Sequence, residues 1–131
     1  MAKSLGFTLI ELLIALTIVA ILATIAYPNF AGYLLKSKRI EAIQGLHSMQ
    51  LQQEEWRISH PAYASNDDAA HFLPSHPHYE FKVKAASDTD YVLEANAKNG
   101  SAQQQDKAGN TACHTLTLNR NSTKTPAACW Q

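Results

Sequence analysis

Gly6-Phe7-Thr8-Leu9-Ile10-Glu11 opens an apolar run that continues through residues 12–27 and decides how this chain is built. As a helix, residues 7–27 would span about 31 Å, which is one bilayer crossing. Glu11 is the only charged residue in this run. A carboxylate inside a membrane helix costs roughly 2.5–3.5 kcal/mol at mid-bilayer, somewhat less near the interface, so its presence there indicates a function.

Three features of this segment occur together in the register of the class III signal of type IV prepilins. A short leader ends at Gly6, Phe7 follows it, and Pro28 ends the apolar run. The resemblance implies that a prepilin peptidase removes residues 1–6 and that Phe7 is then N-methylated. It also implies that Glu11 meets the N-terminal amine of a neighbouring pilin during assembly. The electrostatics agree, because an ammonium and a carboxylate satisfy each other in a low-dielectric bundle.

Two other interpretations of the N-terminus are an ordinary membrane anchor and a secretory signal peptide. The signal peptide fits less well, because the leader is short and no small-residue cleavage site follows the apolar core. The distribution of positive charge opposes export of the C-terminal part: the leader offers Lys3, whereas Lys36, Lys38 and Arg39 follow the span. The motif and the cysteines nevertheless favour export, through a dedicated pathway that recognises the leader.

Pro28 lacks an N–H group and should kink or loosen the helix just before it. Related pilins usually carry a Gly about eight residues earlier, where this chain has Ala20. Alanine favours helix by about 1 kcal/mol over glycine, so local melting is less favourable here than in those relatives.

Residues 28–57 continue with helical spacing as an amphipathic segment. Its apolar positions predict the surface on which a small head packs: Ile40, Ile43, Leu46, Met49 and Trp56. Its polar positions are expected largely on other faces: Lys36, Arg39, Gln44, Gln52 and Gln53. Ser59-His60-Pro61 should end the helix.

Residues 58–131 have room for one small domain. Residues 58–78 are polar and contain proline, which predicts a connecting loop. Strict alternation predicts a strand at residues 79–85. After a turn at residues 87–90, residues 91–97 are predicted to form a second strand, antiparallel to the first. A loop at residues 98–110 and a third strand at residues 115–118 follow. The predicted fold is α+β, with one long N-terminal helix against a small antiparallel sheet, as in the type IV pilin fold.

Cys113 and Cys129 are the only cysteines. In a small exported head they predict a disulfide, which should stabilise it by roughly 3 kcal/mol in the chain-entropy model. A metal site is the weaker alternative, because no paired CxxC motif is present.

The C-terminal segments 108–118 and 126–130 resemble the end of PilE-like minor pilins, including relatives that are DNA-uptake receptors. This resemblance implies a low-abundance pilus subunit that supports assembly, twitching motility, adhesion or DNA uptake. Its partners would be major and minor pilins and the prepilin peptidase/methyltransferase. Its location would be the bacterial inner membrane and then the extracellular pilus. A major pilin or a type II secretion pseudopilin are alternatives, although pseudopilins commonly lack the disulfide loop.

DNA binding is a competing function of a different class. The net charge of zero gives no global field toward nucleic acid, so binding would need a local patch. Lys98, Lys107, Arg120 and Lys124 lie in the two C-terminal loops and could converge near the disulfide to contact phosphates. The alternative is a solvated loop surface, since no aromatic residue is obviously placed beside them for stacking.

The histidines His71, His76 and His78 precede the first predicted strand. A zinc site there would need further ligands and a rigid frame, so we expect neither a metal nor a cofactor. The chain has no phosphate-binding glycine loop and no nucleophile elbow, so we expect no enzyme.

Overall fold

The computed structural model describes residues 6–131. The chain divides into two compact units, Met1–Leu34 and Leu35–Gln131, which we describe separately. Helix α1, Leu9–Ser59, belongs to both. It ends at the residue that the Ser59-His60-Pro61 signal indicates, and Pro28 lies inside it.

The first unit presents apolar side chains without a protein partner surface to bury them. Every described residue from 6 to 34 is exposed, including Phe7 and the leucines and isoleucines that follow it. This part of α1 is long and apolar enough to cross a membrane. Because exposed apolar area of this extent is unfavourable in water, the segment requires lipid or other helices around it.

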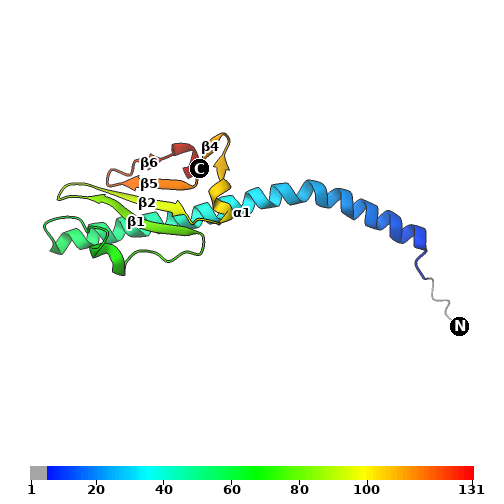
Figure 1. Cartoon of the computed structure of the whole chain (residues 1–131), viewed down its shortest axis with the longest axis horizontal. Helices are drawn as coiled ribbons and strands as arrows, with labels where there is room; N and C mark the ends of the chain where they lie inside the picture. Colours follow the sequence, from blue (N-terminus) through cyan, green and yellow to red (C-terminus); the bar gives the residue numbers. More distant parts are fainter. Residues whose placement is uncertain (1–5) are drawn as a thin grey trace. The chain divides into compact units, whose positions relative to one another are not determined.

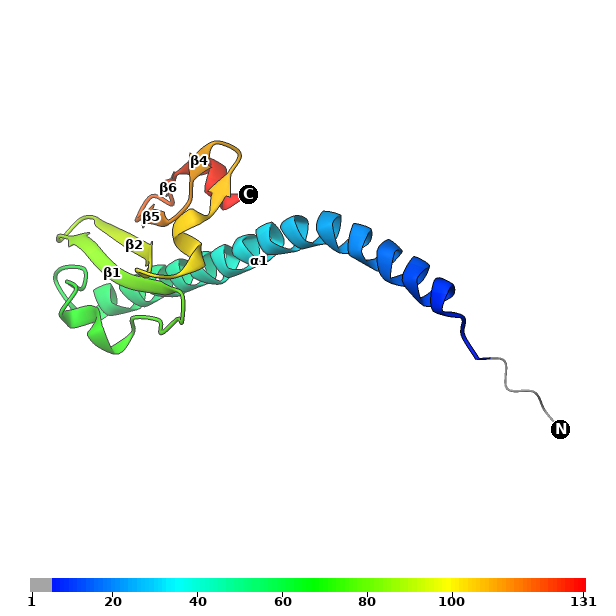
Figure 2. The same cartoon turned by 45° about the vertical axis from the view of Figure 1, so that its right-hand side comes forward.

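The second unit packs a four-stranded antiparallel sheet against the C-terminal part of α1 (Figures 1 and 2). The strand order is β1-β2-β5-β6. The strands are β1 Tyr79–Ala86, β2 Tyr91–Ala97, β5 Thr115–Asn119 and β6 Lys124–Thr125. The three longer strands and the helix against an antiparallel sheet confirm the predicted fold class. A bulge between Val83 and Ala85 shifts the register of β1 against β2.

The core lies between α1 and one face of the sheet. The buried apolar side chains of the strands point toward the helix from that face. Leu46 and Met49 of the helix are fully buried against Leu93 and Leu116 of the central strands. Gly45 gives β1 room to approach, because a Cβ there would lie 2.6 Å from the ring of Phe81.

The packing face of α1 differs from the predicted stripe. Ile40 remains 45% exposed, whereas Arg39 and Gln53, which we expected on other faces, are buried. Both polar side chains have partners that offset the cost of burial, although Arg39 Nε is buried without one. Gln53 accepts a hydrogen bond from the backbone N–H of Ala64 at 2.8 Å and donates one to its carbonyl at 2.9 Å.

Several short elements were not predicted from the sequence. They are the 3-10 helices η1 Asp68–His71, η2 Ala102–Gln105 and η3 Ala127–Trp130, the hairpin strands β3 Lys107–Ala108 and β4 Thr111–Ala112, and the edge strand β6 Lys124–Thr125. Elements of two to four residues have no measurable period, so alternation cannot predict them.

Candidate functional site

The predicted processing site lies immediately before α1. Gly6 and Phe7 are exposed and precede the first helical residue, Leu9. Thr8 caps the helix, since its Oγ1 accepts a hydrogen bond from the N–H of Glu11 at 3.3 Å. The Gly6–Phe7 bond therefore lies outside the helix. The remainder of the predicted leader lies outside the described residues.

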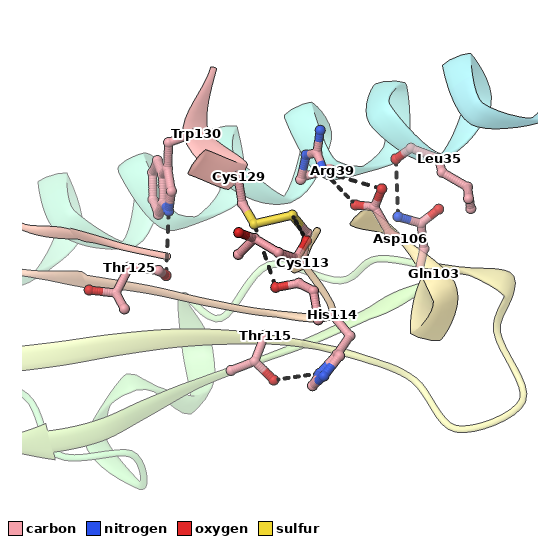
Figure 3. Close-up of a disulfide and its surroundings, with 12 residues drawn as sticks. Leu35, Arg39, Gln103, Asp106, Cys113, His114, Thr115, Thr125, Cys129 and Trp130 are labelled. Atoms are coloured by element: carbon pink, nitrogen blue, oxygen red, sulfur yellow. Dashed lines mark hydrogen bonds and ion pairs between the residues drawn. A yellow bond between two sulfur atoms is a disulfide. The ribbon is translucent and has the colours of Figure 1, made fainter. Parts of the chain in front are cut away.

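The disulfide joins Cys113 to Cys129, and both residues are buried (Figure 3). This confirms the predicted pairing. The disulfide fastens η3 beside the β3–β4 hairpin, and the N–H of Cys113 donates to the carbonyl of Asp106 at 2.9 Å.

A buried ion pair anchors this C-terminal region to the helix (Figure 3). Arg39 Nη1 donates to both carboxylate oxygens of Asp106, at 3.2 and 3.1 Å. Beside it, Gln103 Nε2 donates to the carbonyl of Leu35 at 3.1 Å and to the hydroxyl of Tyr79 at 2.9 Å. These bonds hold η2 on α1.

The cations that follow the apolar run are largely neutralised in the folded head. Lys38 pairs with Glu41 at 3.1 Å, and Arg39 is neutralised by Asp106. Two of the three cations whose position after the span opposed export are therefore held in ion pairs within the head. Lys3 lies outside the described residues.

The four cations proposed for DNA contact do not all lie close together. The N–H of Lys98 bonds to His78 at the end of β2, whereas the N–H of Arg120 bonds to Tyr91 at its beginning. The seven residues of β2 span about 23 Å, so these two cations lie at opposite ends of the sheet. The expectation of one patch near the disulfide is wrong for this pair. Lys107 begins β3, next to Asp106.

Aromatic residues do lie beside two of these cations, contrary to the expectation from the sequence. Lys124 Nζ is 5.5 Å from the ring centroid of Trp130, and the Arg120 guanidinium is 5.7 Å from that of Tyr63. Tyr63 is buried, while Trp130 is half-buried. Only Trp130 therefore offers an accessible edge next to a cation.

The histidines before β1 make structural contacts. His76 Nε2 lies 2.9 Å from Glu41, and its Nδ1 accepts a hydrogen bond from the N–H of His78 at 3.1 Å. The bond from His76, followed by that from Lys38, lowers the pKa of Glu41. Both ring nitrogens of His76 are thus occupied. Within residues 6–131, no three metal-ligating side chains come close enough to hold an ion.

Two sequence families match this chain. Residues 1–27 match the family described as "Prokaryotic N-terminal methylation motif". Residues 28–117 match the family described as "Type IV minor pilin ComP, DNA uptake sequence receptor". The chain belongs to the type IV pilin family. Within that family, the residues that match the ComP description include most of the head domain.

Named relatives are mostly major pilins. The chain is 36% identical over 83 residues to the type IV major pilin protein PilA of Myxococcus xanthus, covering 63% of this chain and 38% of that protein. It is 33% identical over 103 residues to the type IV wide pilus major component PilA4 of Thermus thermophilus, covering 76% and 79%. The chain spans about half the length of several neisserial relatives that it matches.

The fold matches that of a solved type IV pilin from Shewanella oneidensis, with a TM-score of 0.55 and 23% sequence identity. The match covers 74% of this chain and 98% of the other. At this identity the similarity supports the fold alone.

Proposed function

We propose that this chain is a subunit of a bacterial type IV pilus. It would be cleaved between Gly6 and Phe7, methylated at Phe7, held in the inner membrane by residues 7–27, and then assembled into an extracellular filament. The match of residues 1–27 to the methylation motif is the observation that carries this proposal, because these residues begin a helix whose first part is exposed and mostly apolar.

Glu11 would guide assembly. Glu11 is exposed in the first turn of α1 and is the one charged residue in the apolar run of residues 7–27. In lipid or in a helical bundle, that carboxylate is stabilised by a cation, and the new N-terminal amine at Phe7 of another subunit supplies one. Assembly would thereby replace the unfavourable state of the Glu11 carboxylate in lipid with an ion pair in the filament.

Two substitutions test this role. Glu11→Gln should lower incorporation into filaments strongly while leaving membrane insertion intact, and Gly6→Ala should leave uncleaved precursor in the membrane. Thr17→Ala is the matched control, because Thr17 Oγ1 is satisfied within the helix by the carbonyl of Leu13 at 2.8 Å. Normal cleavage and incorporation of both site variants would sink the proposal.

A second function, favoured by the ComP match over residues 28–117, is that of a minor pilin that binds DNA during uptake. Lys98, Lys107, Arg120 and Lys124 remain our proposed phosphate contacts. Since these cations are dispersed, we expect them to contribute unequally to DNA affinity. Lys124 is the best placed, because it lies beside Trp130: the lysine could pair with a phosphate while the ring stacks on a base.

Binding of a fluorescein-labelled mixed-sequence DNA duplex to the full chain in detergent tests the receptor function. Removal of one cation that neutralises a phosphate should reduce the slope of log K against log salt by about 0.9. Replacing all four cations by Ala should therefore weaken binding and flatten its salt dependence. An unmodified chain that fails to bind duplex at low salt would end the DNA proposal and leave the pilus-subunit proposal intact.

A further inference from the structure

A hollow lies at the end of α1, where residues 60–72 fold back beside the last turns of the helix (Figures 1 and 2). Its volume is about 230 Å³, and it is open to solvent. One wall is a continuous strip of the helix, because its residues are three or four positions apart: Gln52, Glu55, Trp56 and Ser59. His71, at the end of η1, and Phe72 form the other wall. Neither proposed function uses any of these residues.

Trp56 is held in place as one surface of this hollow. The ring of His60 stacks on it, with a centroid distance of 3.7 Å and an angle of 6° between the planes. His60 Nδ1 lies 2.9 Å from the carbonyl oxygen of Trp56, which supports the stacked arrangement. Trp56 also packs against the core and remains half-buried. A ligand would therefore meet an aromatic surface whose position is set before binding.

The polar side chains of the helical strip are left without internal partners. Within residues 6–131, the Gln52 amide and the Glu55 carboxylate make no hydrogen bond or ion pair with another residue. Gln53, which lies between them, has both parts of its amide bonded to the backbone of Ala64. Together with the hydroxyl of Ser59, the amide and the carboxylate offer hydrogen-bond donors and acceptors side by side.

An aromatic surface bordered by amide, carboxylate and hydroxyl groups matches the chemistry of a sugar ring. The C–H groups of a pyranose form an apolar face that packs on an aromatic ring, and its hydroxyls both donate and accept hydrogen bonds. The hollow is small, which suits a single ring. We propose that it binds one ring of an uncharged carbohydrate, with Trp56 as the stacking surface and Gln52 and Glu55 as hydrogen-bonding partners of the hydroxyls.

The charge around the hollow disfavours acidic ligands. Residues 51–75 contain four carboxylates and one cation, a net charge of −3: Glu54, Glu55, Asp67, Asp68 and Arg57. The guanidinium of Arg57 donates to two backbone carbonyls rather than facing a ligand. A nucleic-acid phosphate or the carboxylate of an acidic sugar would meet net repulsion here. The hollow is therefore distinct from the proposed DNA contacts, and an uncharged sugar is the class that it takes.

Titration of the full chain with neutral oligosaccharides tests the site. The chain is kept in a polyoxyethylene detergent, because maltoside and glucoside detergents carry sugar head groups that would compete. Trp130→Phe leaves Trp56 as the single tryptophan, so the fluorescence reports on the hollow. The neutral probes are cellotriose, maltotriose and lactose, and the charged probes are sialyllactose and choline chloride. We expect a saturable change in fluorescence with at least one neutral probe and no such change with either charged probe.

Gln52→Ala and Glu55→Ala, each made in the Trp130→Phe chain, are the site variants. Neither side chain has an internal partner whose loss would affect the fold, whereas Trp56 packs against the core and is therefore not replaced. Each variant should weaken the affinity for the neutral probe about fivefold, because it removes a hydrogen bond to a hydroxyl. Gln44→Ala, an exposed amide earlier on the same helix, is the matched control and should bind unchanged.

Three results would overturn the inference. They are the absence of any fluorescence change with the neutral probes, binding of a charged probe as tight as that of the neutral ones, and binding by both site variants that equals the control. Because the titration uses the unassembled chain, its result does not depend on either proposed function. Absence of this chain from filaments would defeat the pilus-subunit proposal and leave the carbohydrate site unaffected.

Discussion

At the level of single residues, the ion pair of Arg39 and Asp106 holds the disulfide region on the helix. Both side chains are at most 4% exposed. Removing one partner leaves a buried charge without compensation, so Asp106→Ala should lower the free energy of unfolding by about 3–5 kcal/mol. Arg39→Met combined with Asp106→Leu should recover most of that loss, because no charge is then buried. Denaturant unfolding followed by tryptophan fluorescence measures both; equal losses in the single and double variants would contradict this account.

Glu94 gives the head a defined pH dependence. Burial opposes its ionisation, but hydrogen bonds from Lys84, Asn96 and Lys82 outweigh burial and lower its pKa to about 2. Because the folded pKa is below its ordinary value of 4.5, the stabilisation is present above that value and is lost as the pH falls toward 2. The two lysines are about half exposed, so we expect a loss of only about 2 kcal/mol between about pH 5 and pH 2.

Unfolding of Glu94→Gln across the same pH range measures that contribution. This variant should lose the corresponding part of the pH dependence, whereas Glu80→Gln, an exposed carboxylate on the preceding strand, should retain it. Parallel pH profiles for Glu94→Gln and the unmodified chain would show that Glu94 does not carry the effect.

Among the elements, the contact of α1 with β1 depends on a missing side chain. Gly45→Ala should gain about 1 kcal/mol of helix propensity, but its Cβ would lie 2.6 Å from the buried ring of Phe81. Overpacking of this kind costs about 1–3 kcal/mol, so we expect net destabilisation by about 1 kcal/mol. Gly32→Ala, in the same helix with nothing within 4 Å, is the control and should not lower the melting temperature. A Gly45→Ala variant as stable as this control would refute the contact.

The longer elements could be predicted because their side chains keep a period. Strict alternation predicted β1, the turn before Tyr91 indicated β2, and helical spacing with a terminating proline predicted the end of α1. The face of α1 could not be predicted fully, because the burial of Arg39 depends on Asp106, which lies 67 residues away. Periodicity assigns a charged residue to solvent unless its partner is known.

The dispersal of the candidate DNA contacts, in contrast, could have been predicted. Lys98 follows one predicted strand and Arg120 follows the next long one, and neighbouring antiparallel strands finish at opposite ends of the sheet along the strand direction. The aromatic neighbours of Lys124 and Arg120 could not, since η3 and the loop carrying Tyr63 reach these cations only through tertiary packing.

For the whole molecule, the disulfide constrains a head of fewer than a hundred residues. It closes a loop with a sequence separation of 16 residues. Replacing Cys113 and Cys129 together by Ser should lower the free energy of unfolding by about 3 kcal/mol. Chemical reduction of the unmodified chain is the parallel measurement and should give a similar loss. Unchanged stability after either treatment would show that the disulfide does not stabilise the head.

The claim that this chain is a processed pilus subunit is tested most directly by quantitative mass spectrometry of sheared, purified surface filaments. The measurement reports both the N-terminal residue of this chain and its molar ratio to the main subunit. We predict a chain that begins with N-methylated Phe7 and is a trace component, as expected for a minor pilin. A dominant amount would make it the structural subunit instead. Its absence from filaments, or a chain that still begins at Met1, would contradict the central claim.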